Sequence, residues 1–268
     1  MNKFDQDVAT VTSIIENGKF TTTEKMQLLS ILQPSYHTSG KIEGITSVDG
    51  SAINCEFCKS MKTAAEKDPT IVCGGCYITA LDKLYKGMTA RHWLNQLILS
   101  ETLFTVEQLK AVYIGSEYIR INADGDMRNA TQARNVLRLA KAHKCNRVTI
   151  WFKNLPAMRE AIEKEGKPRN VRIIYSACRI NDENAAAMME KYSWIDNVFI
   201  VYVDKPDTLR AIEKGACACN GKKCRECGYK CYAAHGWERG KIIAECLRGV
   251  NKEKRAALKK AIAARAEK

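Results

Sequence analysis

The stretch that decides the fold is Arg147-Val-Thr-Ile-Trp-Phe152, followed by the helical segment Pro156–Lys164 and then by Val171-Arg-Ile-Ile-Tyr-Ser176. Two runs of β-branched and aromatic residues thus flank one helix. Parallel strands are buried on both faces, so they read as nearly continuous apolar runs, and a helix usually connects them. The pattern predicts a β–α–β unit of a parallel sheet.

The same alternation continues on both sides of this unit. Further strands are predicted at Ile45–Val48, Tyr118–Asn122 and Val198–Val203, and further helices at Thr79–Leu99, Thr131–His143, Asp182–Lys191 and Pro206–Lys214. This repetition indicates an α/β fold: a partial (βα)-barrel of about six parallel strands, with a doubly wound open sheet as the alternative. In both architectures, ligands bind beyond the carboxyl ends of the strands.

Composition divides the chain into four regions. Residues 1–40 are expected to form an N-terminal helical appendage, in which Thr21 and Glu24 make a capping box. Residues 41–215 form the barrel-like domain, residues 216–248 a cysteine-rich metal-binding segment, and residues 249–268 a basic C-terminal helix. Within the third region, Ile242–Leu247 has the apolar pattern of a helix.

The overall composition is that of a folded protein with a basic balance. The chain has 268 residues, of which 46% are hydrophobic and 27% charged, and its formal net charge is +13. No apolar stretch approaches the roughly 18 residues of a membrane helix, and the first residues lack the layout of a signal peptide. We therefore expect a cytoplasmic protein, and in that compartment paired cysteines more often bind metal than form disulfides.

Nine of the 12 cysteines fall into two groups. The first is Cys55-x2-Cys58-x14-Cys73-x2-Cys76, and two C-x2-C pairs separated by a loop are a common way to hold a tetrahedral metal. The second group is equally dense and has one cysteine more than a four-ligand site needs, which leaves Cys217 or Cys219 as the spare. Its members are Cys217, Cys219, Cys224, Cys227 and Cys231. We predict that both groups bind metal.

The spacing leaves the metal open, because sets of thiolates suit both Zn²⁺ and iron–sulfur clusters. Zinc would indicate small structural knuckles. An iron–sulfur centre would lie near a cavity, and the first group directly follows the first predicted strand. That position favours one or two [4Fe–4S] clusters, with Zn²⁺ as the alternative.

Polar residues follow several of the predicted strands. Asp124-Gly125-Asp126 follows Tyr118–Asn122, Lys153 follows the next strand, and Arg179 lies just beyond the strand after that. Because the carboxyl ends of parallel strands meet at one rim, these side chains are expected to converge there. We predict that they bind a cofactor or substrate, with Asp126 and Lys153 as the catalytic candidates and Asp124 and Arg179 as cofactor contacts. Turn formation is the alternative role for the Asp-Gly-Asp run.

Four motifs carry a resemblance to a known family. They are Gly74-Gly-Cys-Tyr77, Arg120-Ile-Asn-Ala-Asp-Gly-Asp126, Val171-Arg-Ile-Ile-Tyr-Ser176 and Cys224-x2-Cys227-x3-Cys231. Over roughly residues 45 to 235 the chain resembles phage and bacterial proteins of the gene product 88 type. That group is in turn similar to the radical S-adenosylmethionine barrel. The resemblance implies an iron–sulfur cluster after the first strand and an acidic residue after the second that holds the cofactor's amino group.

On this resemblance Asp126 corresponds to the acidic residue, Asp124 is its neighbour, and Ser176 is a further cofactor contact. Radical S-adenosylmethionine enzymes usually carry C-x3-C-x2-C, which leaves one iron open for the cofactor. Here the first group offers a fourth thiol, and the second has C-x2-C-x3-C, the usual order reversed. If all four thiols bind, S-adenosylmethionine cannot reach the first cluster without displacing one of them.

Two functions are compatible with these features. The first is an iron–sulfur enzyme with redox or radical chemistry, for which the basic charge makes a nucleic acid or nucleotide the best substrate. The second is a non-catalytic, zinc-stapled protein that binds nucleic acid. In both, nucleic acid would contact the tail from Asn251 to Lys268, which carries seven Lys/Arg and two Glu. Its alternative role is that of a solvated terminal helix.

Overall fold

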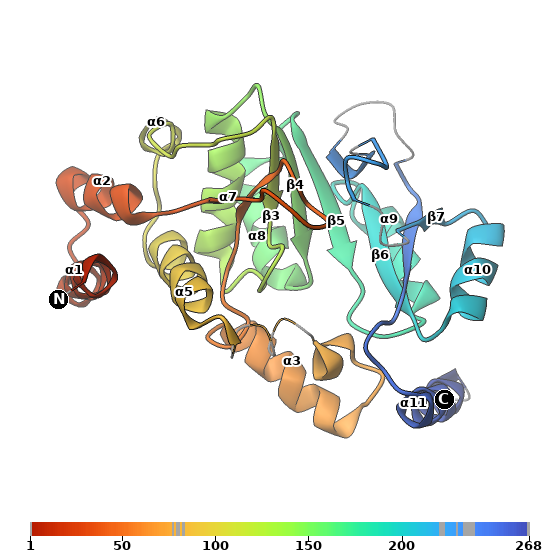
Figure 1. The fold of residues 1–268 in the computed structure, drawn as a ribbon. Helices are drawn as coiled ribbons and strands as arrows, with labels where there is room; N and C mark the ends of the chain where they lie inside the picture. Colours follow the sequence, from red (N-terminus) through yellow and green to blue (C-terminus); the bar gives the residue numbers. More distant parts are fainter. Residues whose placement is uncertain are drawn as a thin grey trace.

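The computed structural model describes residues 2–266 apart from positions 77, 79–80, 82–83, 220–222, 229 and 233–238. Its centre is a mixed sheet of eight strands in the order β1-β2-β3-β4-β5-β6-β8-β7 (Figure 1). β1 pairs antiparallel with β2, and the other pairings are parallel. The strands are Ser35–Tyr36 (β1), Thr46–Val48 (β2), Tyr118–Ile121 (β3), Arg147–Phe152 (β4), Val171–Ser176 (β5), Asn197–Tyr202 (β6), Cys217–Ala218 (β7) and Ile242–Cys246 (β8).

Helices connect and cover these strands. They are Lys3–Asn17 (α1), Thr22–Ile31 (α2), Glu56–Lys67 (α3), Lys86–Glu101 (α5), Val106–Leu109 (α6), Ala130–Ala142 (α7), Leu155–Glu165 (α8), Ala187–Lys191 (α9), Lys205–Glu213 (α10) and Lys252–Ala266 (α11). Short 3-10 turns occur at Val72–Gly75, Glu183–Ala186 and Lys230–Tyr232. None of the helices in the described part of the chain has the length and apolar character needed to cross a bilayer.

The sheet has one apolar face and one face of mixed character. On β4, Val148, Ile150 and Phe152 belong to the main hydrophobic core, which also takes in the buried sides of α5, α7 and α8. The alternate residues Thr149 and Trp151 point the other way, as the two-residue period of a strand requires. The face opposite α7 and α8 is therefore left for other contacts, and Cys219 and Cys231 pack against Trp151 and its neighbours on that side.

The α/β class and the parallel strands are confirmed, and β4 and β5 have the predicted bounds. The barrel is not confirmed, because β1 and β7 are the edge strands of an open sheet in the described part of the chain. The doubly wound order is absent from β2 to β6, where chain order and spatial order coincide. The sheet also has two more strands than predicted.

The predicted helix at Ile242–Leu247 is wrong, because these residues form β8. β8 lies between β6 and β7, so residues 216–248 contribute two strands to the main sheet. The segment Asp182–Lys191 forms a 3-10 turn followed by the short helix α9. The two N-terminal helices are confirmed, including the capping box between Thr21 and Glu24.

Candidate functional site

A cavity of about 1360 Å³ lies over the sheet face opposite α7 and α8. Its floor consists of strand residues that point away from the main core, among them Arg120 on β3, Trp151 on β4 and Phe199 on β6. Its rim includes residues that follow the carboxyl ends of β3 and β4. The cavity thus occupies the position at which parallel α/β sheets bind ligands.

Both cysteine groups open into this one cavity. Nine cysteines line it: Cys58, Cys73, Cys76, Cys217, Cys219, Cys224, Cys227, Cys231 and Cys246. Cys55, the remaining member of the first group, is fully buried behind Cys58. Two segments about 150 residues apart in the sequence therefore bring their thiols to the same space.

The first group is arranged by α3 and the 3-10 turn that follows it. Cys55 is the N-cap residue of α3 and Cys58 lies one turn further on, so both side chains are on the same side of the helix start. Cys73 lies within the turn Val72–Gly75, and Cys76 ends that turn. A Cβ at Gly74 would lie 2.8 Å from the Cβ of Ala65, so the glycine lets the turn pack closely against α3.

The surroundings of the first group oppose ionisation of two of its thiols, those of Cys58 and Cys73. The hydrogen bond with Cys55, together with burial, raises the pKa of Cys58, while the same bond lowers that of Cys55. Burial raises the pKa of Cys73 to about 11, although Lys153 acts in the opposite direction. Cys178 is also an electrostatic neighbour of Cys73. A metal ion bound among these thiols would lower their pKa values, because metal ions bind the thiolate form.

The second group surrounds the end of β7 and the turn at Lys230–Tyr232. Cys231 has Cys219, Cys224 and Cys227 as electrostatic neighbours, and burial raises its pKa to about 12. The backbone N–H of Cys219 donates to the carbonyl of Ala244 (2.8 Å), which extends the β7–β8 pairing and fixes this cysteine beside the sheet. The thiols of Cys219, Cys224, Cys227 and Cys231 therefore form one group. Of the two candidates for the fourth position, Cys217 and Cys219, it is Cys219 that belongs to this group.

Arg120 provides half-buried positive charge next to the second group. Its guanidinium lies 4.4 Å from the centre of the Trp151 ring. Burial alone would lower the pKa of Arg120, but Tyr232 and Cys224 outweigh it, so the net shift is upward. Arg120 also opposes the rise in the pKa of Cys231. It can therefore balance thiolate charge at this end of the cavity.

The predicted catalytic residue Asp126 borders the cavity but is buried. Its carboxylate accepts backbone N–H bonds from Met127 (2.7 Å), Lys153 (2.8 Å) and Asn154 (3.3 Å). Burial raises its pKa to about 6 against the effect of these bonds and of Lys153. The geometry is that of a carboxylate that fixes the loop after β4, and its catalytic role stays a prediction.

Lys153 and Ser176 come together as predicted for neighbouring strand ends. The ammonium group of Lys153 donates to the hydroxyl of Ser176 (2.8 Å), and both line the cavity beside Cys73. Arg179 lies elsewhere: it pairs with Asp68 (2.9 Å), is half exposed, and borders a surface hollow next to α11. The structure therefore brings Lys153 and Ser176 to the first cysteine group and does not bring Arg179 there.

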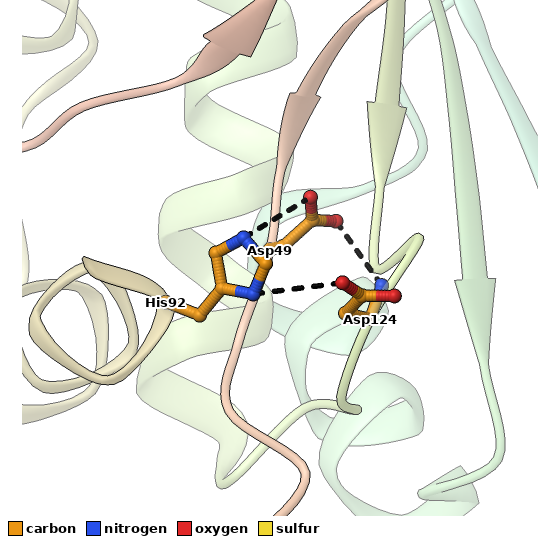
Figure 2. A group of neighbouring side chains, drawn as sticks. All are labelled: Asp49, His92 and Asp124. Atoms are coloured by element: carbon orange, nitrogen blue, oxygen red, sulfur yellow. Dashed lines mark hydrogen bonds and ion pairs between the residues drawn. The ribbon is translucent and has the colours of Figure 1, made fainter. Parts of the chain in front are cut away.

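Two residues near the rim were missed at the sequence level. His92 on α5 is 3% exposed and lies between the carboxylates of Asp49 and Asp124 (Figure 2). Of the three, Asp124 was predicted as a site residue and lines the cavity. One feature of the sequence could have pointed to His92. The residues His92, Asn95 and Gln96 are polar but share the buried face of α5 with Leu99.

A family model described as gene product 88 matches residues 21–252. No curated protein matches the chain, and no solved structure does. The matched residues include the whole sheet, both cysteine groups and the rim of the cavity. The chain therefore belongs to the gene product 88 family.

Proposed function

We propose that this protein is an iron–sulfur enzyme that uses two thiolate-held clusters in one cavity for redox or radical chemistry. The observation that carries the proposal is the convergence of nine cysteines on the open face of a parallel sheet. A protein that needed only structural metal knuckles would have no need to place both at the ligand-binding edge of its sheet.

The charge around the cavity fits this occupancy. Eight lining residues are basic: Lys41, Lys59, Lys62, Arg120, Lys153, Lys230, Lys241 and Arg248. Four are acidic: Asp124, Asp126, Glu226 and Glu245. A tetrathiolate cluster in its oxidised [4Fe–4S] form carries a net charge of about −2. The basic excess of the lining therefore balances two such clusters.

The similarity to the radical S-adenosylmethionine barrel is part of the proposal. Strands β2 to β6 follow one another without reversal, as in a partial barrel. In this reading, the first group holds the cluster that would receive S-adenosylmethionine in exchange for one of its four thiols, and Lys153 and Ser176 would contact the cofactor. When bound, the cluster would supply one electron to cleave the cofactor. Lys153 would hold positive charge beside Cys73, and Ser176 would orient the Lys153 ammonium group.

Anaerobic purification followed by iron, sulfide and zinc analysis tests the proposal. We expect close to eight iron and eight sulfide per chain, with the broad visible absorption of iron–sulfur clusters. Two zinc per chain and no iron would overturn it and would favour the zinc-stapled alternative. Reductive cleavage of S-adenosylmethionine by the iron-loaded protein then tests the radical version, and 5′-deoxyadenosine no higher than in a cluster-free control would exclude it.

The substrate class that we propose is nucleic acid, contacted through α11. This helix is anchored to the body: Leu258 is buried, Lys259 pairs with Asp204, and Arg265 donates to the carbonyl of Ile180 (3.2 Å). Lys252, Lys254 and Lys260 are exposed and are free of these anchoring contacts. Replacing these three lysines with glutamine should weaken oligonucleotide binding and reduce its salt dependence, because each lost phosphate contact lowers the slope by about 0.9. An unchanged salt slope would overturn this part.

A further inference from the structure

Asp49, His92 and Asp124 form a compact cluster that the proposed iron–sulfur chemistry does not use. One ring nitrogen and one oxygen from each carboxylate all lie within 4.8 Å of one another. Figure 2 shows the imidazole of His92 between the two carboxylates, with Nε2 3.9 Å from Asp49 and Nδ1 3.6 Å from Asp124. The side chains of Asp49 and His92 are 2% and 3% exposed, and that of Asp124 is 16% exposed.

Two glycines bring the carboxylates together. Asp49-Gly50 follows β2 and Asp124-Gly125 follows β3, so the same dipeptide ends two neighbouring parallel strands. The backbone N–H of Gly50 donates to the carbonyl of Asp124 (3.2 Å). Oδ1 of Asp49 in turn accepts the backbone N–H of Ala123 (2.6 Å). The two loops are thereby held in a fixed register that faces α5.

His92 is held in this cluster without a hydrogen bond to its Nδ1 atom. That atom is buried and has no hydrogen-bond partner, and 3.6 Å is too long for a hydrogen bond to Asp124. Buried polar atoms are normally satisfied by protein, water or an ion, so an orphaned imidazole nitrogen aimed at a carboxylate indicates a missing partner. One ring nitrogen and one oxygen of each carboxylate lie within 4.8 Å of one another. Ligands bonded to one ion at about 2.1 Å lie about 3.0–3.4 Å apart, so a bound ion would draw these atoms closer together.

The carboxylate of Asp49 is oriented by two residues outside the cluster, Ser47 and His37. Ser47 donates its hydroxyl to Oδ2 of Asp49 and receives a hydrogen bond from Nε2 of His37 (2.7 Å). Such outer hydrogen bonds fix the direction of metal-binding carboxylates. Two carboxylates buried within a few ångströms of each other also repel, and a divalent cation between them would remove that repulsion.

We propose that Asp49, His92 and Asp124 bind one divalent transition-metal ion, Mn²⁺ or Fe²⁺, at a site separate from the cysteines. One imidazole and two carboxylates are the donors that these ions accept, whereas thiolates select softer metals. Three protein ligands leave coordination positions for water or substrate. Because Asp124 lines the cavity, those positions face the space into which the cysteines also open.

Titration of the anaerobically purified full-length protein with Mn²⁺, followed by electron paramagnetic resonance, tests the site. Manganese is the probe because its preference for oxygen and nitrogen donors keeps it off the thiols. The metal content is measured first, so that an ion already bound is counted. We expect one tightly bound Mn²⁺ per chain, with nitrogen modulation from the imidazole in the pulsed spectrum.

The variants His92→Gln and Asp124→Asn should each weaken Mn²⁺ binding at least about tenfold, since each replaces an imidazole or carboxylate ligand with a more weakly binding amide. His92→Gln should also abolish the nitrogen modulation. Glu245→Gln is the matched control: it neutralises a carboxylate that lines the same cavity and pairs with Lys41, and it should leave Mn²⁺ binding unchanged. If a variant fails to fold, the nitrogen modulation of the wild-type protein still shows whether an imidazole binds the Mn²⁺ ion.

Wild-type protein that binds no Mn²⁺ and contains no other ion at this site would overturn the proposal. So would Mn²⁺ binding that is unaffected by both variants, or that shows no nitrogen modulation. Absence of any bound ion is the result expected if His92 is instead an imidazolium ion held between Asp49 and Asp124. The iron and sulfide analysis is a separate measurement, so a failure here is distinguishable from a failure of the iron–sulfur proposal.

Discussion

The backbone of Gly125 lies against that of Gly50: a Cβ atom at Gly125 would be 2.5 Å from the carbonyl oxygen of Gly50. Gly125 also has a φ of +73°, a conformation that residues with a side chain rarely adopt. This contact joins the loops that carry Asp49 and Asp124. It therefore holds these two loops close together at the rim of the cavity.

Gly125→Ala should cost about 2–4 kcal/mol of unfolding free energy, because it combines an unfavourable φ with a collision against backbone atoms that cannot rotate away. Urea unfolding measures the loss. Gly18→Ala is the matched control, since Gly18 has a left-handed φ of +63° but a Cβ atom there would meet nothing within 4 Å. It should cost only about 1 kcal/mol. Equal losses in the two variants would show that the approach to Gly50 is unimportant.

The second cysteine group distinguishes Cys219 from Cys217. Cys219 is an electrostatic neighbour of both Cys224 and Cys231 and packs beside Cys231 under Trp151. If this group binds a cluster, Cys219→Ser should remove roughly half of the iron from the chain, and Cys217→Ser should leave the iron content unchanged. The reverse result would make Cys217 the fourth ligand.

Lys153 is expected to retain the first cluster without binding it. Its charge opposes the rise in the pKa of Cys73 and of Cys178. Lys153→Met should therefore release iron about tenfold faster to a chelator, which is the lower end of the effect of outer-shell changes on metal sites. Ser176→Ala removes the hydrogen bond but keeps the charge, so it should have the smaller effect. Identical iron release from both variants would mean that the charge of Lys153 is irrelevant.

The sequence was sufficient for the central strands. Val148–Phe152 consists of β-branched and aromatic residues on both faces, and that enrichment favours a buried strand over a helix. It was not sufficient for β8. Ile242-Ile-Ala-Glu-Cys246 is a short apolar segment of the kind that fits a helix or a strand equally well. Its insertion between β6 and β7 depends on pairings that no local pattern records.

The sequence predicts the cysteines as metal ligands, a role that stays a prediction, and it does not single out His92. Cysteine pairs at close spacing are recognisable because each pair chelates within one turn. His92 has no such neighbour in the sequence, and it meets Asp49 and Asp124 only because α5 packs across the loops after β2 and β3. Asp126 shows the opposite case: a carboxylate at the right place in the sequence is turned toward backbone N–H groups.

Glu165 on α8 and two arginines on α7 form an ion-pair cluster, here called the clamp, whose contribution to stability depends on pH. Glu165 is 8% exposed and pairs with Arg134 (2.9 Å) and Arg138 (2.8 Å). Although burial alone would raise its pKa, these two guanidinium groups lower it below the usual value of 4.5. A carboxylate with a lowered pKa stabilises the folded state above its unfolded pKa and loses that contribution as the pH falls through the folded value.

Glu165→Gln should therefore cost about 1–2 kcal/mol at pH 7, and the difference from wild type should shrink as the pH falls below about 4.5. Only the difference between the two proteins is read, so acid effects on the rest of the molecule cancel. Glu163→Gln is the control: Glu163 faces Arg159 at 3.7 Å with both side chains exposed, and it should change stability by less than about 0.5 kcal/mol. A wild-type advantage over Glu165→Gln that persists undiminished at about pH 3 would show that the clamp acts through packing and not through charge.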